Sequence, residues 1–413
     1  MGGNRFYLII ILGLLSAIGA FSIDTYISGF PSIAADFHVS IDTVSYSISS
    51  FFLGICIGQM ICGPLLDRFG RRKPLLIGLF LYTLASVGCA LSTSIEMLIV
   101  VRFFQALGGC VGIVAPRAIV RDIFPLNEIA RVFSLLVLVL GVSPIIAPTI
   151  GSYLIIGSGW QSVFWLQVII GLSLLITVFF FLPESRPGDV SMSLHPKVVS
   201  VNFFRIFTNT QFITYALCGA VVSSGVYAYL AGSAVVFMKI YGVNEQQYGY
   251  IFGMTAAGLI GSSQLNTLVL RRRTSMAIIR IVLPIQAVLG LLLVGLSVAG
   301  LHTFNSMVLF VLVFISCQGF IQPNTTALSL APFTKDAGSA SALMGAIQMS
   351  FGASATALVG WLGNGTSIPL TAIMAACPVI ALLILLAGKL IAPLPPVPHL
   401  FSEEDRRGTE DVS

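Results

Sequence analysis

The chain has 413 residues, of which 56% are hydrophobic and only 9% are charged, with a formal net charge of +5 and a mean hydropathy of +0.98. A soluble globule of this size needs more polar surface, so the composition excludes one and indicates a lipid bilayer as the solvent. The net charge does not indicate a nucleic-acid partner, because the basic residues stand between apolar runs and form no continuous face.

Apolar stretches recur along the whole chain. A membrane-spanning helix needs about 20 mostly apolar residues. We interpret the first stretch as such a helix and not as a cleaved signal, because its n-region holds only one basic residue, Arg5. The predicted fold class is an all-α integral membrane protein with twelve transmembrane helices. The twelve stretches are roughly 6–33, 43–66, 74–93, 96–120, 128–154, 161–182, 209–237, 246–270, 275–299, 305–330, 338–363 and 367–391.

The distribution of Lys and Arg predicts the orientation. The short turn between the second and third stretches, Gly63 to Lys73, holds five charges, four of them basic. The same side collects most other Lys and Arg residues between stretches, whereas we place only Lys239 on the opposite side. By the positive-inside rule, the basic side lies in the cytoplasm. We therefore expect a multi-pass protein of a bacterial cytoplasmic (inner) membrane with both termini in the cytoplasm.

The longest loop divides the twelve stretches into two sets of six. We expect an N-terminal bundle (1–182), a cytoplasmic central loop (183–208), a C-terminal bundle (209–391) and a disordered cytoplasmic tail (392–413). A degenerate repeat at a shift of 200 residues supports the division, since it places the basic run 71–73 on 271–273. Many secondary transporters consist of two such repeats with a site near the midplane.

One motif resembles a signature sequence of the major facilitator superfamily. The charged turn resembles the signature that this family carries between helices 2 and 3. The matching positions are Gly63, Asp67, Arg68, Gly70 and Arg71. The signature is highly specific, and the resemblance runs from about residue 6 to residue 391. It implies the twelve-helix fold of that family.

Four further segments resemble the drug:proton antiporters of this family or one of their subfamilies. The spacing of Arg102, Gln105 and Gly108 is similar to a second signature, in helix 4. The segment 143–152 is similar to the antiporter motif of helix 5, but has Ser, Ala and Ser at three usual Gly positions. The segments 22–31 and 120–125 resemble the bicyclomycin/chloramphenicol-resistance (Bcr/CflA) subfamily.

This resemblance implies a proton-coupled antiporter for multidrug efflux and antibiotic resistance. Its cargo would be small, moderately hydrophobic molecules of the bicyclomycin or chloramphenicol type. The alternative is a dedicated metabolite or siderophore carrier of the same fold, working in export or import. A transport-dead sensor or scaffold is disfavoured, because the loops and the tail are too short for a soluble domain.

Asp24 is the first candidate for proton coupling. It is the only acidic residue that we place deep in any of the twelve stretches, and an intramembrane carboxylate indicates function by default. The structural alternative is a hydrogen bond to a neighbouring helix. We expect Arg102 to pair with it, because Arg102 lies about 9 Å inward from Glu96 by helical rise, at a similar depth. The resemblance implies that Arg102 helps to move the proton, and the alternative is snorkelling to the outer headgroups.

The resemblance assigns the charged turn to a cytoplasmic gate. Asp67 would accept hydrogen bonds from the start of helix 11, near Gly338, and Arg71 would pair with Asp122 at the end of helix 4. Purely topogenic charges would explain the arginines but not Asp67. In helix 5, a bend would seal the periplasmic side. Its residues would be Pro144, Pro148 and Gly151, although Gly and Pro are common in membrane helices.

Polar and aromatic side chains within the stretches are candidates for a substrate cavity. They would suit a neutral or weakly charged solute. The alternative is that they pair between helices. The predicted cavity residues are Tyr26, Gln105, Tyr227, Gln318, Gln322 and Gln348.

The sequence holds no enzyme signature. A phosphate-binding G-x-x-x-x-G-K-[ST] motif is absent, and the four His residues lie in loops or in the tail. We therefore expect no metal site and no cofactor. The expected partners are a small-molecule substrate, protons and the lipid bilayer, and the protein is expected to be a monomer.

Overall fold

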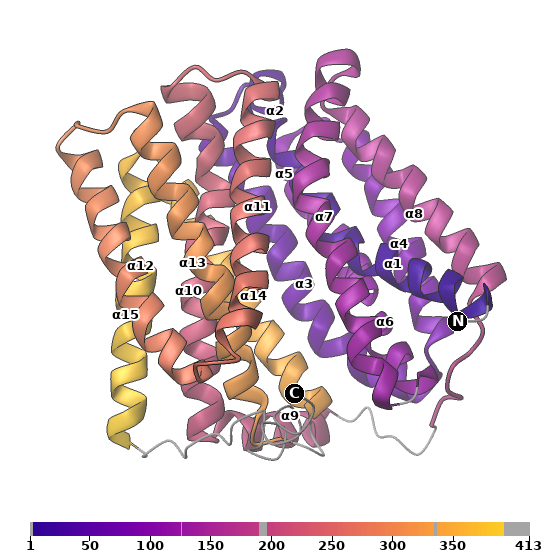
Figure 1. The fold of residues 1–413 in the computed structure, drawn as a ribbon. Coiled ribbons are helices and arrows are strands. Elements are labelled where there is room, and N and C mark those ends of the chain that lie inside the picture. The colour runs from indigo at the N-terminus through magenta and orange to yellow at the C-terminus, as the bar shows by residue number, and fades with distance from the viewer. Residues whose placement is uncertain (1–2, 125, 190–195, 334–336, 392–413) are drawn as a thin grey trace, which may run out of the picture.

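The structure is a computed structural model that describes residues 3–124, 126–189, 196–333 and 337–391 (Figure 1). Every regular element within these ranges is helical, and twelve long helices occur where the sequence predicts them. The predicted fold class is confirmed. The bounds are α1 (Gly3–Ile27), α3 (Ile41–Phe69), α4 (Arg72–Ala90), α5 and α6 (Ile95–Gly109 and Val111–Ile123, one span), α7 (Leu126–Ser158), α8 (Gln161–Phe181), α10 and the π-helical turn η1 (Thr210–Ala234 and Val235–Ile240, one span), α11 (Glu245–Val269), α12 (Ser275–Val298), α13 (Phe304–Leu330), α14 (Ala337–Trp361) and α15 (Ile368–Ile391).

The outer surface of the helices is apolar. Among the described residues, ten helices are long and apolar enough to cross a membrane, and α7 and α11 complete the twelve. On α4, Ile77, Phe80 and Leu84 are 70%, 60% and 58% exposed, and their spacing puts them on one helix face. Such a face is stable only in hydrocarbon, so the chain is a multi-pass membrane protein.

Two short helices lie outside the twelve spans. The predicted first stretch is divided, because α1 ends at Ile27 and α2 (Phe30–Asp36) carries Pro31 in its first turn. Proline fits that position, where its missing N–H costs no hydrogen bond. The second short helix, α9 (Pro196–Phe207), lies within the predicted central loop. The predicted tail, 392–413, lies outside the described residues.

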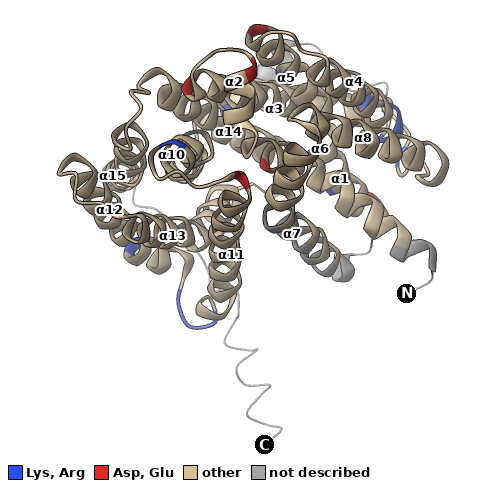
Figure 2. Ribbon diagram, turned by 90° about the horizontal axis from the view of Figure 1, so that it is seen from above, with Lys and Arg blue, Asp and Glu red and all other residues tan. Residues whose placement is uncertain are grey.

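The helices form two groups that meet along a seam (Figures 1 and 2). The first group contains α1 to α8, and the second contains α10 to α15. Figure 2 shows them side by side from above, with few charged residues among the helices. Helix α3 packs on α14, and α7 packs on α11. Across the seam, Ser49 Oγ donates to Thr356 Oγ1 at 2.7 Å, and Gln246 Nε2 donates to the Tyr153 hydroxyl at 2.8 Å.

Candidate functional site

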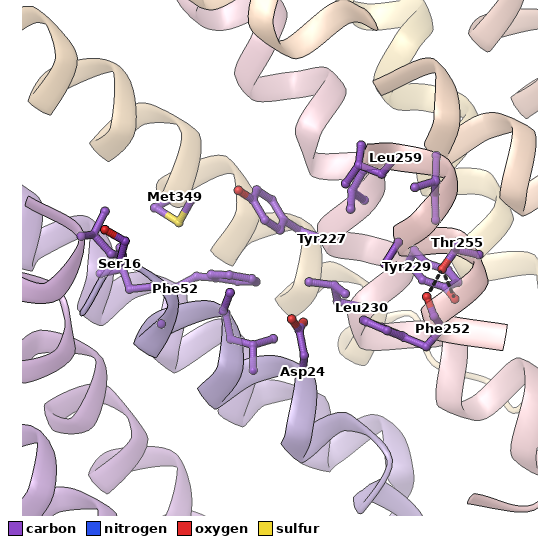
Figure 3. Close-up of a pocket in the computed structure, with 18 of the residues that line it drawn as sticks. Ser16, Asp24, Phe52, Tyr227, Tyr229, Leu230, Phe252, Thr255, Leu259 and Met349 are labelled. Atoms are coloured by element: carbon purple, nitrogen blue, oxygen red, sulfur yellow. Dashed lines mark hydrogen bonds between the residues drawn. The ribbon is translucent and has the colours of Figure 1, made fainter. Parts of the chain in front are cut away.

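A cavity of about 340 Å³ lies in the seam between the two groups (Figure 3). Helices α1, α3 and α6 of the first group line it, and α10, α11, α13 and α14 of the second group close it from the other side. Its wall is mostly apolar and aromatic. The aromatic side chains are Phe52, Tyr227, Tyr229 and Phe252. A cavity with this position and lining is suited to a small apolar solute.

One face of α1 forms the floor of this cavity. Ser16, Gly19, Ala20, Ile23 and Asp24 all line it, in the i, i+3, i+4, i+7 pattern of a single helix face. The first three have small side chains and therefore leave room in the cavity. The last places a carboxyl group in an otherwise apolar wall.

Asp24 points into the cavity between Phe52 and Leu230 (Figure 3). Its side chain is 6% exposed, and its Oδ2 atom has no hydrogen-bond partner in the described structure. An intramembrane carboxylate with an unsatisfied oxygen is costly when it is charged, and a proton removes that charge. Asp24 is therefore the one acidic group of the cavity wall, and its charge state depends on proton binding.

Arg102 is fully buried on the opposite side of α1. Its Nη1 atom donates to the backbone oxygen of Ser22 at 3.2 Å and to Gln105 Oε1 at 2.7 Å. Its guanidinium carbon lies 4.2 Å from the ring centre of Phe51 and 4.7 Å from that of Tyr26. Cation–π contacts of this kind are strongest where water is excluded. Arg102 thus joins α1, α3 and α5 inside the first group.

The predicted ion pair between Asp24 and Arg102 is not formed in this conformation. The reason is angular. Ser22 and Asp24 are two residues apart, which is about 200° around an α-helix, so they face nearly opposite sides of α1. Depth along the helix, on which the prediction relied, does not report this angle.

Gln105 and Tyr26 belong to the same interior and do not line the cavity, contrary to their predicted place. Gln105 Nε2 donates to Ser86 Oγ and to Gln167 Oε1, both at 2.7 Å. The Tyr26 hydroxyl lies 2.8 Å from Ser47 Oγ. Their polar atoms are satisfied between helices of the first group, which was the structural alternative for this set.

The three predicted glutamines of the second group form a separate network around Ser223. The Ser223 hydroxyl donates to Gln322 Oε1 and accepts from Gln318 Nε2, both at 2.7 Å, and it lies 3.2 Å from Gln348 Nε2. Gln348 Nε2 also lies 3.4 Å from the Tyr227 hydroxyl. Of these residues, only Tyr227 lines the main cavity, whereas Gln322 and Gln348 line a smaller pocket beside it.

Several cavity residues escaped the sequence analysis. Phe252, Thr255 and Met349 have ordinary membrane-helix chemistry, and only the packing of α11 and α14 brings them here. Arg117 is different, because a basic residue inside an apolar stretch is a visible signal. It is exposed and lines the cavity from α6.

The charged turn between α3 and α4 is held by ion pairs. Arg71 Nε lies 2.8 Å from Asp122 Oδ2, and Arg71 Nη1 lies 2.5 Å from Asp67 Oδ1. Burial lowers the pKa of the Arg71 guanidinium, but the hydrogen bonds and charges of these two carboxylates outweigh it and leave the pKa above its usual range. Glu184, which the sequence analysis did not single out, accepts a hydrogen bond from the Arg71 backbone N–H at 2.6 Å.

The remaining residues of the turn have local roles. Gly70 ends α3 with φ of +84°, which favours glycine. The Arg68 guanidinium lies 5.8 Å from the Phe69 ring centre, and Gly63 has open space around it. The side-chain contact described for Asp67 is the one with Arg71. Its predicted partner site is near Gly338, and the side chains of residues 334–338 lie outside the described residues.

Helix α7, in which the sequence predicts a bend, is one continuous helix that packs against α1 and α11. A Cβ atom on Gly151 would collide with the backbone carbonyl group of Thr25, the residue next to Asp24. The Pro148 carbonyl faces Gly249 of α11. The side chain of Pro144 lies outside the described residues. Gly151 therefore allows a close approach of α7 to α1, beside the cavity.

The chain is similar to known membrane transporters. Residues 11–356 match the family described as Major Facilitator Superfamily. An uncharacterized MFS-type transporter YdgK of Bacillus subtilis is 32% identical over 380 residues, 90% of this chain and 93% of the relative. A bicyclomycin resistance protein homolog of Haemophilus influenzae is 30% identical over 380 residues, 92% and 95% of the two chains. The solved structure of a D-xylose–proton symporter has a TM-score of 0.72 at 14% identity and covers 95% of this chain and 98% of its own.

Proposed function

The chain belongs to the major facilitator superfamily, and we propose that it is a proton-coupled antiporter exporting small, moderately hydrophobic molecules from the cytoplasm. The observation that carries the proposal is Asp24, a buried carboxyl group with an unpartnered oxygen in an apolar cavity between the two helix groups. A relative named a bicyclomycin resistance protein homolog supports drug-like cargo.

In the proposed cycle, solute and proton exclude each other at Asp24. The solute enters the cavity from the cytoplasm while Asp24 carries its negative charge. A proton from the outer side then neutralises the carboxylate, weakens solute binding and favours the return of the empty carrier. A ligand can shift a conformational equilibrium only through its different affinities for the two states, and protonation of Asp24 supplies that difference.

Arg102, the charged turn and Gly151 would support this cycle without contacting the solute. Arg102 would position α1, and so the cavity face that carries Asp24. Arg71, with Asp67 and Asp122, would latch the cytoplasmic ends of α3 and α6, and Gly151 would let α7 close against α1. The two groups would move as bodies in a monomer of the bacterial inner membrane. The distribution of Lys and Arg predicts that both termini lie in the cytoplasm.

Substrate-induced proton release in inside-out vesicles tests the proposal. Chloramphenicol or bicyclomycin is added to vesicles with an established proton gradient, and we expect the gradient to collapse with wild type but not with Asp24→Asn. Glu96→Gln, which changes an exposed acid at the start of α5, is the matched control and should behave as wild type. Equal responses of wild type and Asp24→Asn would reject Asp24 as the coupling group. No response to any compound would favour a dedicated metabolite or siderophore carrier.

A further inference from the structure

Arg117 is a charged cavity residue for which the proposed cycle has no use. It lies on α6 and lines the same cavity as Asp24, with its side chain exposed. The other residues along the cavity are uncharged. The cavity therefore has one basic and one acidic side chain in a wall that is otherwise aromatic and aliphatic.

The two charges lie at different depths. Gly19 of α1 packs against Ile113 of α6, where an added Cβ would lie 3.4 Å from the Ile113 side chain, so these residues share one level. The first and fourth spans run in opposite directions. Asp24 lies five residues beyond Gly19, and Arg117 four residues beyond Ile113. At 1.5 Å of rise per residue, their backbones are separated by about 13 Å along the helix axes.

We propose that the cavity selects zwitterionic amphiphiles, binding an anionic group at Arg117 and a protonated amine at Asp24. The proposal rests on the proposed function, because it names the substrate class of the same cavity. The apolar body of the solute would lie along the wall formed by Phe52, Tyr227 and Phe252. The cytoplasmic end of the cavity holds the arginine, since Arg117 lies five residues before Asp122 at the charged turn.

The opposite charges also explain how such a solute is released. A deprotonated Asp24 attracts the amine, and a proton on Asp24 removes that attraction while Arg117 keeps its charge. A purely anionic solute would be repelled by the deprotonated carboxylate. It would therefore bind together with a proton and would not compete with one. Exchange of solute for proton therefore favours a solute with an amine at the Asp24 end.

Three related probes separate the two contacts. Norfloxacin carries a carboxylate and a piperazine amine at opposite ends of a flat ring system. Its methyl ester lacks the negative charge, and its N-acetyl derivative lacks the positive charge. Binding of each is measured by equilibrium dialysis with purified protein in lipid nanodiscs at pH 7.5. We expect wild type to bind norfloxacin roughly tenfold more tightly than either derivative, as for one hydrogen-bonded charged contact.

Two variants assign the contacts. In Arg117→Gln the preference over the methyl ester should disappear while the preference over the N-acetyl derivative remains, and in Asp24→Asn the reverse should hold. Arg117→Lys should keep a reduced preference over the ester. Arg280→Gln is the matched control, because Arg280 lies five residues inside α12 and does not line the cavity. It should match wild type.

The wild-type measurement alone can overturn the inference. Equal affinity for norfloxacin and its methyl ester, or no binding of any of the three, would exclude an anion contact at Arg117. An unchanged preference in Arg117→Gln would do the same. Proton release induced by chloramphenicol would leave the proposed antiport standing in each case. Loss of proton release with intact ligand preferences would instead reject the antiport and keep the binding mode.

Discussion

Arg102 donates a hydrogen bond to the backbone carbonyl of Ser22, 3.2 Å away, so its charge is fixed to the face of α1 that turns away from the cavity. The guanidinium lies among the rings of Phe51, Tyr26 and Phe164, at 4.2, 4.7 and 5.8 Å. In this conformation Arg102 acts on the cavity through α1 and α3, two lining helices that it holds together.

Replacement of Arg102 should therefore lower the stability of the protein and leave the coupling of proton to solute transport unchanged. In Arg102→Lys the planar contacts with the rings are lost, and we expect a loss of about 1–2 kcal/mol of unfolding free energy. Thermal unfolding of the purified protein measures this, with Arg280→Lys as the control. The ratio of protons released to solute transported should stay at the wild-type value. A stable Arg102→Lys protein with a changed ratio would show that Arg102 takes part in proton transfer.

Cation binding should depend on pH through Asp24. Tetraphenylphosphonium has a permanent charge and no titrating group, so its affinity reports the charge of the cavity. As pH falls, protonation of Asp24 removes the negative charge, and the affinity of wild type should weaken by at most about tenfold per pH unit. Dialysis between pH 8 and pH 5 measures the slope, and Asp24→Asn should show none. A common slope in both proteins would assign the titration to another group.

The ion pair at the charged turn should show energetic coupling. Arg71→Gln and Asp122→Asn each break the 2.8 Å contact, so their combined effect should fall short of the sum of the single effects by about 0.5–3 kcal/mol. Denaturant titrations of the four proteins measure this value. Arg72→Gln is the control, because the Arg72 guanidinium bonds the Phe179 carbonyl and should add independently to Asp122→Asn. If the effects of Arg71→Gln and Asp122→Asn on stability were fully additive, the ion pair would not hold the ends of α3 and α6 together.

Gly151 should tolerate no side chain. In Gly151→Ala the new methyl group would meet the Thr25 backbone and push α7 away from α1, with an expected cost of about 1–3 kcal/mol and a loss of transport. Gly157→Ala, on the same helix with open space around it, should be as stable as wild type or slightly more stable. Thermal unfolding and proton release measure both effects. Equal behaviour of the two variants would exclude the close α1–α7 approach.

The helices were predictable because hydrocarbon thickness fixes the length of an apolar run. The sequence ranges and the observed bounds differ by a few residues, as for α12, predicted at 275–299 and observed at Ser275–Val298. The place of Asp24 in the cavity was predictable as well, since a lone carboxylate in such a run is costly against lipid. The break between α1 and α2 was marked by Pro31 in the sequence, although the predicted range ran through it.

The partners of polar side chains were less predictable. Gln105 and Gln318 are polar residues in apolar runs, as ligand-binding residues of a membrane cavity would be. Each is nevertheless hydrogen-bonded to other side chains of its own helix group. That outcome depends on which helices are neighbours and on how each is rotated, and neither is encoded in a single helix. Arg117 was a visible signal that depended on the same information, because only the packing of α6 against α1 turns it into the cavity.

The small side chains of α1 set the size of the space that is available to a solute in the cavity. Ser16, Gly19 and Ala20 leave space above α1, while the facing wall includes the rings of Tyr227, Tyr229 and Phe252. The largest cargo that fits is then decided by three neighbouring positions of one helix. In Ala20→Leu the larger side chain would exclude the largest solutes from the cavity, whereas the smallest solutes would still be transported. The largest solute that this protein accepts would thus decrease in size as the side chains at these positions of α1 increase in volume.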